Sequence, residues 1–350
     1  MEPVRLGIIG CGVIGRMHAR VAADSELLRP VAVADVREAV AQEVAAQYGV
    51  ARAYGSAEAL LADPAIEAVV LALPTAGRAE LALAAFSAGK HVLVEKPIAL
   101  NAAEVRRMIA ARSDLIGGCC SSRMRGLPSA SVASALIASG ALGQLRVVRC
   151  RALKGAGAPP QNPPPSWRLS KAMNGGGILV NWGCYDLDYL LGITGWAIEP
   201  RLALARSWRV PETFAAYAAP GSDAETHVAA LILCDDGLTL SYERGEFVAG
   251  ATDEAWQVLG DRGALRLQMP PGANKSIWHD EATPQGVVSN LIWQGDEPGG
   301  SDHIHVLEDF ARAVRENRAP RTSLEQALLV QRITDAIYAS AEQGAAVEVA

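Results

Sequence analysis

The fold of this chain is indicated by one stretch close to its start, Val4-Arg5-Leu6-Gly7-Ile8-Ile9-Gly10-Cys11-Gly12-Val13-Ile14-Gly15. An apolar strand runs into a glycine-rich turn that opens a helix, which is the fingerprint of a dinucleotide site. Gly10 permits the tight turn, Gly12 lets the backbone approach a pyrophosphate, and Gly15 lets the helix pack on the strand. The backbone of the turn, including Cys11, Val13 and Ile14, is therefore expected to hold the phosphates of a dinucleotide cofactor.

A second apolar run, 31–34, ends in an acid, Asp35. It lies about twenty residues after the last glycine, where a carboxylate accepts hydrogen bonds from the adenosine ribose and repels a 2′-phosphate. This favours NAD over NADP. Val36 and Arg37 are expected at the same place, and Arg37 is the one feature here that could accommodate the 2′-phosphate. The alternative is a glycine turn in some other α/β protein, with Asp35 as a helix cap.

The next hundred residues alternate short apolar runs with alanine-rich helical patterns, which predicts a parallel sheet with crossover helices. Strands are expected at 4–9, 31–34, 68–73, 91–94 and 115–119, and helices at 12–22, 37–48, 56–62, 78–88 and 102–111. Ser56 and Asn101 stand where N-caps are wanted, and Gly89 where a left-handed residue ends a helix. The predicted class is α/β, with a doubly wound Rossmann domain over 1–122.

Beyond about residue 125 the pattern changes, and residues 123–350 are predicted to form an α+β domain. Strands at 146–153, 202–208, 226–234, 238–247, 256–260 and 264–268 suggest a mostly antiparallel open sheet with one covered face. Helices are expected at 129–139, 178–192, 303–316 and 323–342. Between 154 and 174 a Gly- and Pro-rich segment with Pro163-Pro164-Pro165 fits no regular element, and a loop of this length is often functional.

Composition excludes several classes of function. The 350 residues carry a net charge of −6 and contain no basic run, so nucleic acid is not expected as a partner. No apolar run approaches the ~18 residues that span a bilayer, and no secretory signal is visible. The six cysteines are scattered and His303-Ile304-His305 has poor ligand spacing, so we expect no metal, and thiols in a reducing cytoplasm.

The most specific candidate for chemistry is Glu95-Lys96-Pro97, at the end of the apolar run His91–Val94. A lysine between an acid and a proline at a strand's carboxyl end is a poor core residue and a good cation to hold over a cofactor. Glu95 is expected to touch the cofactor or the lysine. Leu73-Pro74-Thr75, at the end of the third strand, is expected beside the ribose and nicotinamide.

A second constellation follows Gly175-Gly176-Gly177. Asn181, Tyr185 and Asp188 are spaced by four and three residues, so all three can share one face of the expected helix. The spacing alone leaves two readings open, a satisfied polar patch and a proton-handling site.

Taken together, these segments resemble the Gfo/Idh/MocA oxidoreductase family. The match rests on Gly10–Gly15, on the run from Gly89 to Pro97, on Gly175–Asp188 and on the terminal helices within Phe310–Val347, and so spans nearly the whole chain. The resemblance implies a Rossmann domain and a second domain whose sheet often forms an oligomer interface, so we expect a homodimer or homotetramer. It also implies reversible hydride transfer at a secondary alcohol of a sugar or cyclitol.

The resemblance assigns the family lysine to Lys96, and the family's Asp-x-x-x-His pair and following acid to Asn181, Tyr185 and Asp188. The chain departs from the pattern at Asn181 and Tyr185, and the two changes are consistent, because a phenol needs no carboxylate to fix a tautomer. Arg78 is a third departure, since many relatives have histidine there. It is expected either to reshape the cofactor pocket or to form a surface ion pair.

The expected chemistry needs a base for the hydroxyl proton. A tyrosine with a reference pKa near ~10 is a poor base at pH 7, and a nearby cation can offset this. Tyr185 is therefore the expected acid/base with Lys96 polarising the reacting oxygen, although Lys96 could take the proton itself. Substrate contacts are expected from these two residues and from Trp167, Arg168, Asn181, Trp182, Asp188 and His303.

Three functions remain open from the sequence. The leading one is an NAD-dependent oxidoreductase of a sugar, aminosugar, glycoside or cyclitol. The others are a glycosidase-type enzyme that uses NAD in a transient redox cycle, and a catalytically inactive NAD-binding sensor.

Overall fold

The structure is a computed structural model that describes residues 1–162, 164–300 and 303–350, so Pro163 of the triple proline lies outside the described residues. The chain divides into two compact units. The first unit is Met1–Arg123 with Gly300–Leu329, and the second unit is Met124–Gly299 with Val330–Ala350. The division at residue 122 drawn from the sequence assigned 300–329 to the second domain, whereas these residues pack with the first unit.

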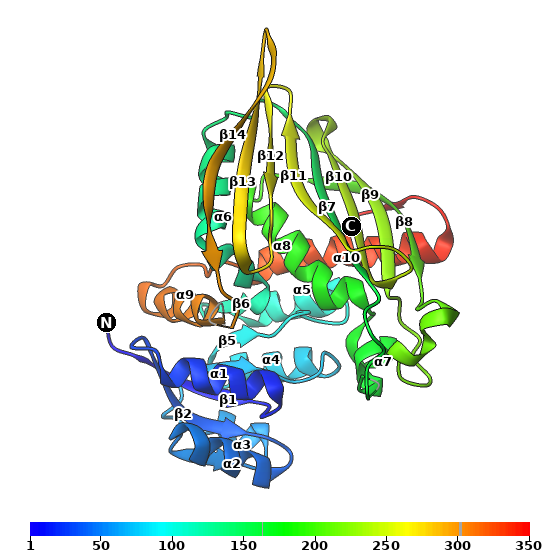
Figure 1. The fold of residues 1–350 in the computed structure, drawn as a ribbon. Coiled ribbons are helices and arrows are strands. Elements are labelled where there is room, and N and C mark those ends of the chain that lie inside the picture. Colours follow the sequence, from blue (N-terminus) through cyan, green and yellow to red (C-terminus); the bar gives the residue numbers. More distant parts are fainter. Residues whose placement is uncertain (163, 301–302) are drawn as a thin grey trace. The chain divides into compact units, whose positions relative to one another are not determined.

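The first unit contains a six-stranded sheet in the order β3-β2-β1-β4-β5-β6, with every pairing parallel (Figure 1). This is the doubly wound Rossmann order. The strands are β1 (Val4–Ile9), β2 (Leu28–Ala34), β3 (Arg52–Tyr54), β4 (Ala68–Leu71), β5 (His91–Val94) and β6 (Gly117–Cys119). The prediction of a parallel Rossmann sheet is confirmed, although β3 was missed.

Helices cover both faces of this sheet. They are α1 (Val13–Ala23), α2 (Glu38–Tyr48), α3 (Ala57–Leu61), α4 (Arg78–Ser87), α5 (Ala102–Ala111) and α9 (His303–Glu316). Ser56 and Asn101 accept N-cap hydrogen bonds, from Ala59 N at 3.2 Å and Glu104 N at 3.0 Å, as predicted. The core on one face joins α1 and α2 to Leu307 and Phe310 of α9, so this late helix completes the first unit.

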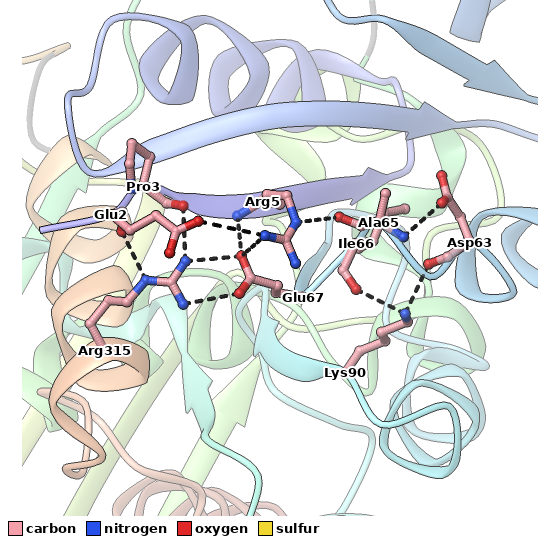
Figure 2. A network of polar contacts seen from close by, with 9 residues as sticks. All are labelled: Glu2, Pro3, Arg5, Asp63, Ala65, Ile66, Glu67, Lys90 and Arg315. Carbon is pink, nitrogen blue, oxygen red and sulfur yellow. Dashed lines mark hydrogen bonds and ion pairs between the residues drawn. The ribbon is translucent and has the colours of Figure 1, made fainter.

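A polar network fixes the amino-terminal ends of the strands in the first unit (Figure 2). Arg315 of α9 donates to both oxygens of Glu67, at 3.0 and 2.9 Å, and Arg5 N donates to the same carboxylate at 2.9 Å. The buried Lys90 donates to the carbonyls of Asp63 and Ile66 at 2.9 and 2.8 Å. Lys90 of the predicted Gly89–Pro97 run thus has a structural role, at the end of the sheet opposite to Lys96.

The second unit contains a nine-stranded sheet in the order β14-β13-β12-β11-β7-β10-β9-β8-β15. Only the pairing of β10 with β7 is parallel among the described pairings, so the prediction of a mostly antiparallel sheet is confirmed. The strands are β7 (Leu145–Gly155), β8 (Pro200–Trp208), β9 (His227–Cys234), β10 (Thr239–Val248), β11 (Asp253–Gly260), β12 (Gly263–Leu267), β13 (Gly272–Thr283), β14 (Gly286–Glu297) and β15 (Val347–Glu348).

One face of the large sheet is covered by helices, including α6 (Pro128–Ala138), α8 (Cys184–Ile193) and α10 (Leu324–Gln343) (Figure 1). The other elements are short: η1 (Cys120–Gly126), η2 (Ser166–Leu169), α7 (Lys171–Asn174), η3 (Leu179–Gly183), η4 (Glu212–Tyr217) and η5 (Asp235–Gly237). The expectation that no regular element lies in 154–174 is wrong, because η2 and α7 form there. Among the described residues, no helix has the length and apolar character needed to cross a membrane.

Candidate functional site

The glycine turn between β1 and α1 has the shape that a dinucleotide requires. Gly10 has a φ of +97°, and a Cβ at this residue would collide with the carbonyl of Ala72. A Cβ at Gly15 would collide with the carbonyl of Gly10. At Gly12, by contrast, no described atom lies within 4 Å of the Cβ position, and this residue begins α1 without a side-chain cap. The open, uncapped helix start leaves N–H groups for a phosphate, so the turn fits the cofactor.

Asp35 follows β2 and reaches the same turn. Its Oδ2 accepts from Cys11 N at 2.9 Å and its Oδ1 from Arg37 N at 3.0 Å, while Arg37 Nε lies 3.7 Å from Oδ1. Val36 beside it is 91% exposed. Burial, with a smaller effect of the Asp35 charge, raises the pKa of the Cys11 thiol to about 11. Cys11 is therefore a small residue that fits the turn and is poorly suited to form a thiolate.

Arg78 begins α4 and is buried. Its guanidinium donates to the carbonyls of Leu73 at 3.1 Å, of Glu95 at 2.6 Å, and of Pro97. The expectation of a surface ion pair is therefore wrong. Arg78 instead joins the segment after β4, which contains Leu73, Pro74 and the buried Thr75, to the segment after β5.

Glu95, at the end of β5, lies in a buried group of titratable side chains. Its Oε1 is 2.8 Å from His18 Nε2 and its Oε2 accepts from Lys96 N at 2.9 Å. Burial opposes ionisation of Glu95, but the hydrogen bond with His18 and the charges of His18 and Lys96 hold its pKa well below the usual range. His303, predicted as a substrate contact, lies in this group, with its ring edge-on to His18 at 5.8 Å.

In the second unit, the triple glycine is a site of close packing. Gly175 has a φ of +83°, and a Cβ at Gly177 would collide with the carbonyl of Glu225. The Glu225 carboxylate accepts from Gly177 N and Leu179 N, both at 3.0 Å, and from the Tyr338 hydroxyl at 2.8 Å. Burial raises the pKa of Glu225 despite these hydrogen bonds. Glu225 thus fixes the start of the segment that carries the second constellation.

The predicted single helix over 178–192 is two elements, which changes how the constellation is arranged. Leu179–Gly183 is a π-helical turn, and α8 follows it. Asn181 and Trp182 lie on the π turn, whereas Tyr185 lies on α8. The four-residue spacing of Asn181 and Tyr185 therefore does not place them on one face as it would in an α-helix. Short π segments inside helices are frequent at functional sites. Tyr185 is buried, with its ring 5.7 Å from that of Trp182.

Trp182 is half-buried and has two cations near its ring. The Arg244 guanidinium lies 4.6 Å from the centre of its ring and the Lys154 ammonium 5.7 Å away, from β10 and β7. Cations in these positions are attracted to the face of an indole.

The two acids of α8 are both paired with arginine. Asp188 is fully buried, and its Oδ1 accepts from Arg125 Nε at 2.6 Å. Asp186 is also fully buried, beside Tyr242 and Trp256, with Arg244 at 3.5 Å. Burial raises the pKa of Asp186 in spite of that arginine.

Trp167 and Arg168, which were predicted as substrate contacts, lie on η2. Trp167 is 50% exposed. Arg168 forms an ion pair with Glu246 of β10 at 2.8 Å, which fixes η2 to the sheet.

Sequence reasoning missed His18, Glu225, Arg125 and Arg244. His18 had a local signal, because it lies three residues after Gly15 on a helix that must face the sheet. The other three meet their partners over 48, 63 and 58 residues of sequence, and no motif marks them.

Comparison with known proteins agrees with this architecture. The model of the oxidoreductase family with an NAD-binding Rossmann fold, Gfo/Idh/MocA, matches residues 4–115, and the Gfo/Idh/MocA C-terminal domain matches residues 131–266. A D-xylose 1-dehydrogenase (NADP⁺) of Haloferax volcanii is 31% identical over 98% of each chain. A myo-inositol 2-dehydrogenase of Thermotoga maritima is 32% identical over 56% of each chain.

A solved structure of levoglucosan dehydrogenase with NADH and levoglucosan has the same fold, with a TM-score of 0.84 and 24% identity over 99% of this chain and 100% of that one. The glycine turn, the strand order and these matches lead to one assignment. The chain belongs to the Gfo/Idh/MocA oxidoreductase family, and it is a dehydrogenase that acts on CH–OH groups.

Proposed function

We propose that this enzyme transfers a hydride between NAD and a secondary alcohol or ketone of a sugar, glycoside or cyclitol, with Lys96 and Tyr185 acting on the reacting oxygen. The observation that carries the proposal is the placement of Lys96 directly after β5, in the same parallel sheet as the open glycine turn after β1. In such sheets ligands bind at the carboxyl ends of the strands.

The chain's own residues have distinct tasks toward the cofactor. The N–H groups from Gly10 to Gly15 would hold the pyrophosphate, and Asp35, Val36 and Arg37 the adenosine ribose. Leu73, Pro74, Thr75, Arg78 and Glu95 would line the other half. When bound, the nicotinamide supplies the hydride acceptor or donor. Asp35 supports NAD as the preferred form, whereas the Haloferax relative is named for NADP⁺ and Arg37 is the residue that could serve it.

Proton transfer falls to Tyr185 in this proposal. A neutral phenol is a poor base, so it needs a cation close to the reacting oxygen to favour loss of the proton. Lys96 supplies that charge and donates a hydrogen bond to the same oxygen. Asn181 and Trp182, on the π turn before Tyr185, orient the substrate.

The arrangement of charges supports a neutral polyol over an aminosugar. Asp188 could have recognised an amine, but it is fully buried beside Arg125, and Asp186 is likewise buried beside Arg244. The exposed indole of Trp167 and the half-buried Trp182 instead offer aromatic faces, which suit the apolar face of a sugar ring. Arg168 would line the same region. The dehydrogenases named above act on a pentose, an inositol and an anhydrosugar.

A homodimer or homotetramer is part of the proposal. Its support in the structure is the exposed apolar row of Leu204 on β8 and of Leu231 and Leu233 on β9, on one face of the large sheet.

The test is absorbance in the nicotinamide band while the purified enzyme, with NAD⁺ or NADP⁺, is offered aldoses, glycosides, anhydrosugars, cyclitols and aminosugars. NADH should appear with one class of neutral polyol. If no NADH appears with any substrate although NAD⁺ binds, and mass spectrometry detects the products of glycoside cleavage, the proposal would be replaced by a transient redox mechanism. Turnover of an aminosugar alone would contradict the substrate class.

A further inference from the structure

The segment around Lys96 is held on one side by a buried arginine. Arg78 donates to carbonyls on both flanks of the lysine, those of Glu95 and Pro97, and also to that of Leu73. A guanidinium has five N–H donors in a rigid plane, so one side chain can bridge several carbonyls at fixed angles. Because these partners are backbone carbonyls on the segments after β4 and β5, the bonds fix the geometry of the backbone around Lys96.

The same segment is held on its other side by a carboxylate. Glu95 Oε2 accepts the N–H of Lys96 itself, and Oε1 is in contact with His18 Nε2. His18 is fully buried and belongs to α1, the helix that begins at the glycine turn. A chain of two hydrogen bonds therefore connects the helix expected to hold the pyrophosphate with the backbone of Lys96.

Cys120 lies beside this pair, and the ligand atoms of His18, Glu95 and Cys120 are all within 4.8 Å of one another. The donor set resembles that of a metal site. However, the 2.8 Å contact between His18 and Glu95 is a hydrogen-bond distance, so these two groups are bonded to each other. The group is therefore better described as a hydrogen-bonded support for Glu95.

We propose that Arg78 and His18 are positioning residues for Lys96. Arg78 fixes the carbonyls before and after the lysine, and His18 orients the carboxylate that holds its N–H group. Together they set the direction in which the lysine side chain leaves the backbone. The inference rests on the proposed role of Lys96 at the reacting oxygen.

The physical reason is the sensitivity of catalysis to geometry. A lysine side chain is long and flexible, so the place of its ammonium depends on how firmly its backbone is held. A displacement of about 1 Å in a reacting group can cost about 100-fold in rate. Loss of either support should therefore lower kcat much more than it weakens binding.

The experiment compares Arg78→Lys, His18→Ala and His18→Gln with Lys96→Met and with Arg107→Ala as the control. Arg107 pairs with Glu80 of α4 at the surface, so its loss removes an arginine bonded to the same helix as Arg78 without touching the Lys96 segment. The readouts are kcat, the KM for NAD⁺ and for the sugar, and amide hydrogen exchange of Lys96. The exchange measurement needs neither substrate nor cofactor.

Arg78→Lys and His18→Ala should each lower kcat by about 100-fold with nearly unchanged KM values, and the Lys96 amide should exchange faster. His18→Gln keeps an N–H donor for Glu95 and should recover most of both losses. Arg107→Ala should match the wild type in every readout.

The proposal is overturned if Arg78→Lys and His18→Ala keep wild-type kcat and amide exchange while Lys96→Met is inactive, and in that case the role of Lys96 still stands. If Lys96→Met is active, the proposed function of Lys96 fails first and the positioning role fails with it. If Arg78→Lys does not fold, the His18 pair decides, because failure of glutamine to recover kcat would equally contradict positioning through Glu95.

Discussion

Two buried glutamates, one in each compact unit, perform the same mechanical task in opposite electrostatic settings. Glu95 accepts the N–H of Lys96, and Glu225 accepts two N–H groups at the start of the segment that leads to Tyr185. Glu95 has His18 and Lys96 beside it, and its pKa is lowered. Glu225 has a phenol and amides as its partners, and burial raises its pKa.

The comparison shows how each unit fixes a candidate catalytic residue. In the first unit, the backbone around Lys96 is held by two charged side chains, the Glu95 carboxylate and the Arg78 guanidinium. Such surroundings suit a residue whose proposed role is to present a cation. In the second unit, the segment that leads to Tyr185 is held by neutral hydrogen-bond donors and by close packing of its glycines. The charged side chains on α8 form ion pairs, such as Asp188 with Arg125. The support in the first unit is therefore mainly electrostatic, and the support in the second unit is mainly close packing.

The largest expected effect on turnover comes from removing the two side chains whose segments these glutamates hold, Tyr185 and Lys96. Tyr185→Phe should lower turnover by about 10²–10⁴-fold if the phenol transfers the proton, with NADH binding intact. Lys96→Met should lower it at least as much, because in the proposed mechanism it removes the charge that favours loss of the phenol's proton. The measurement is kcat beside NADH affinity by calorimetry. A loss below tenfold for Tyr185→Phe would move the proton to Lys96 and end the division of tasks between the units.

Two glycine substitutions, one in each unit, test the contrast between cofactor binding and close packing, with a smaller expected effect on the enzyme. Gly12→Ala places a methyl group where no described atom lies within 4 Å, so the melting temperature should hardly change. The methyl group would occupy the approach of the pyrophosphate, and NADH should bind at least about tenfold more weakly, a loss of about 1.4 kcal/mol.

Gly177→Ala should behave in the opposite way. Its Cβ would collide with the carbonyl of Glu225, and overpacking of this kind costs about 1–3 kcal/mol of folding stability. NADH affinity of the folded enzyme should be unchanged, because the change lies in the second unit. Thermal unfolding and calorimetry on both variants check the pair, and equal loss of stability in the two would show that the glycine turn is as tightly packed as the triple glycine.

The sequence predicted the first unit better than the second because its signals are local. Residues 4–15 and 91–97 are short runs that each predict a strand and the turn after it. The glycine turn and the place of Lys96 at the end of a strand both follow from these runs. β3 was missed because Arg-Ala-Tyr contains no apolar run. The hairpin of β13 and β14 was missed because residues 286–291 of β14 are exposed on both faces, so this strand lacks the usual alternation of buried and exposed positions.

The remaining errors come from long-range packing. An amphipathic helix such as α9 shows that it has a buried face but not which core receives it, so its place beside α1 and β1 could not be read. The π turn begins where Glu225 accepts hydrogen bonds from Gly177 and Leu179, which are 48 and 46 residues away in sequence. The partners of Asp188 and Asp186, which are Arg125 and Arg244, are equally distant in sequence, so the sequence did not show that Asp188 is buried beside an arginine.

The smallest expected effect tests the glutamates themselves through pH. Glu95 has a lowered pKa in the folded chain, so it contributes stability above the unfolded value near ~4.3 and loses it as the pH falls below that value. Glu225 has a raised pKa, so its contribution is present at low pH and is lost as the pH rises through the folded value. Urea unfolding of Glu95→Gln and Glu225→Gln between pH 3 and 8 should give opposite trends, each on the order of 1–3 kcal/mol. The deficit of Glu95→Gln relative to wild type should grow from pH 3 to pH 5, whereas that of Glu225→Gln should shrink as the pH rises. Parallel trends would mean that both carboxylates are held in one charge state, and the electrostatic contrast between the two units would be lost.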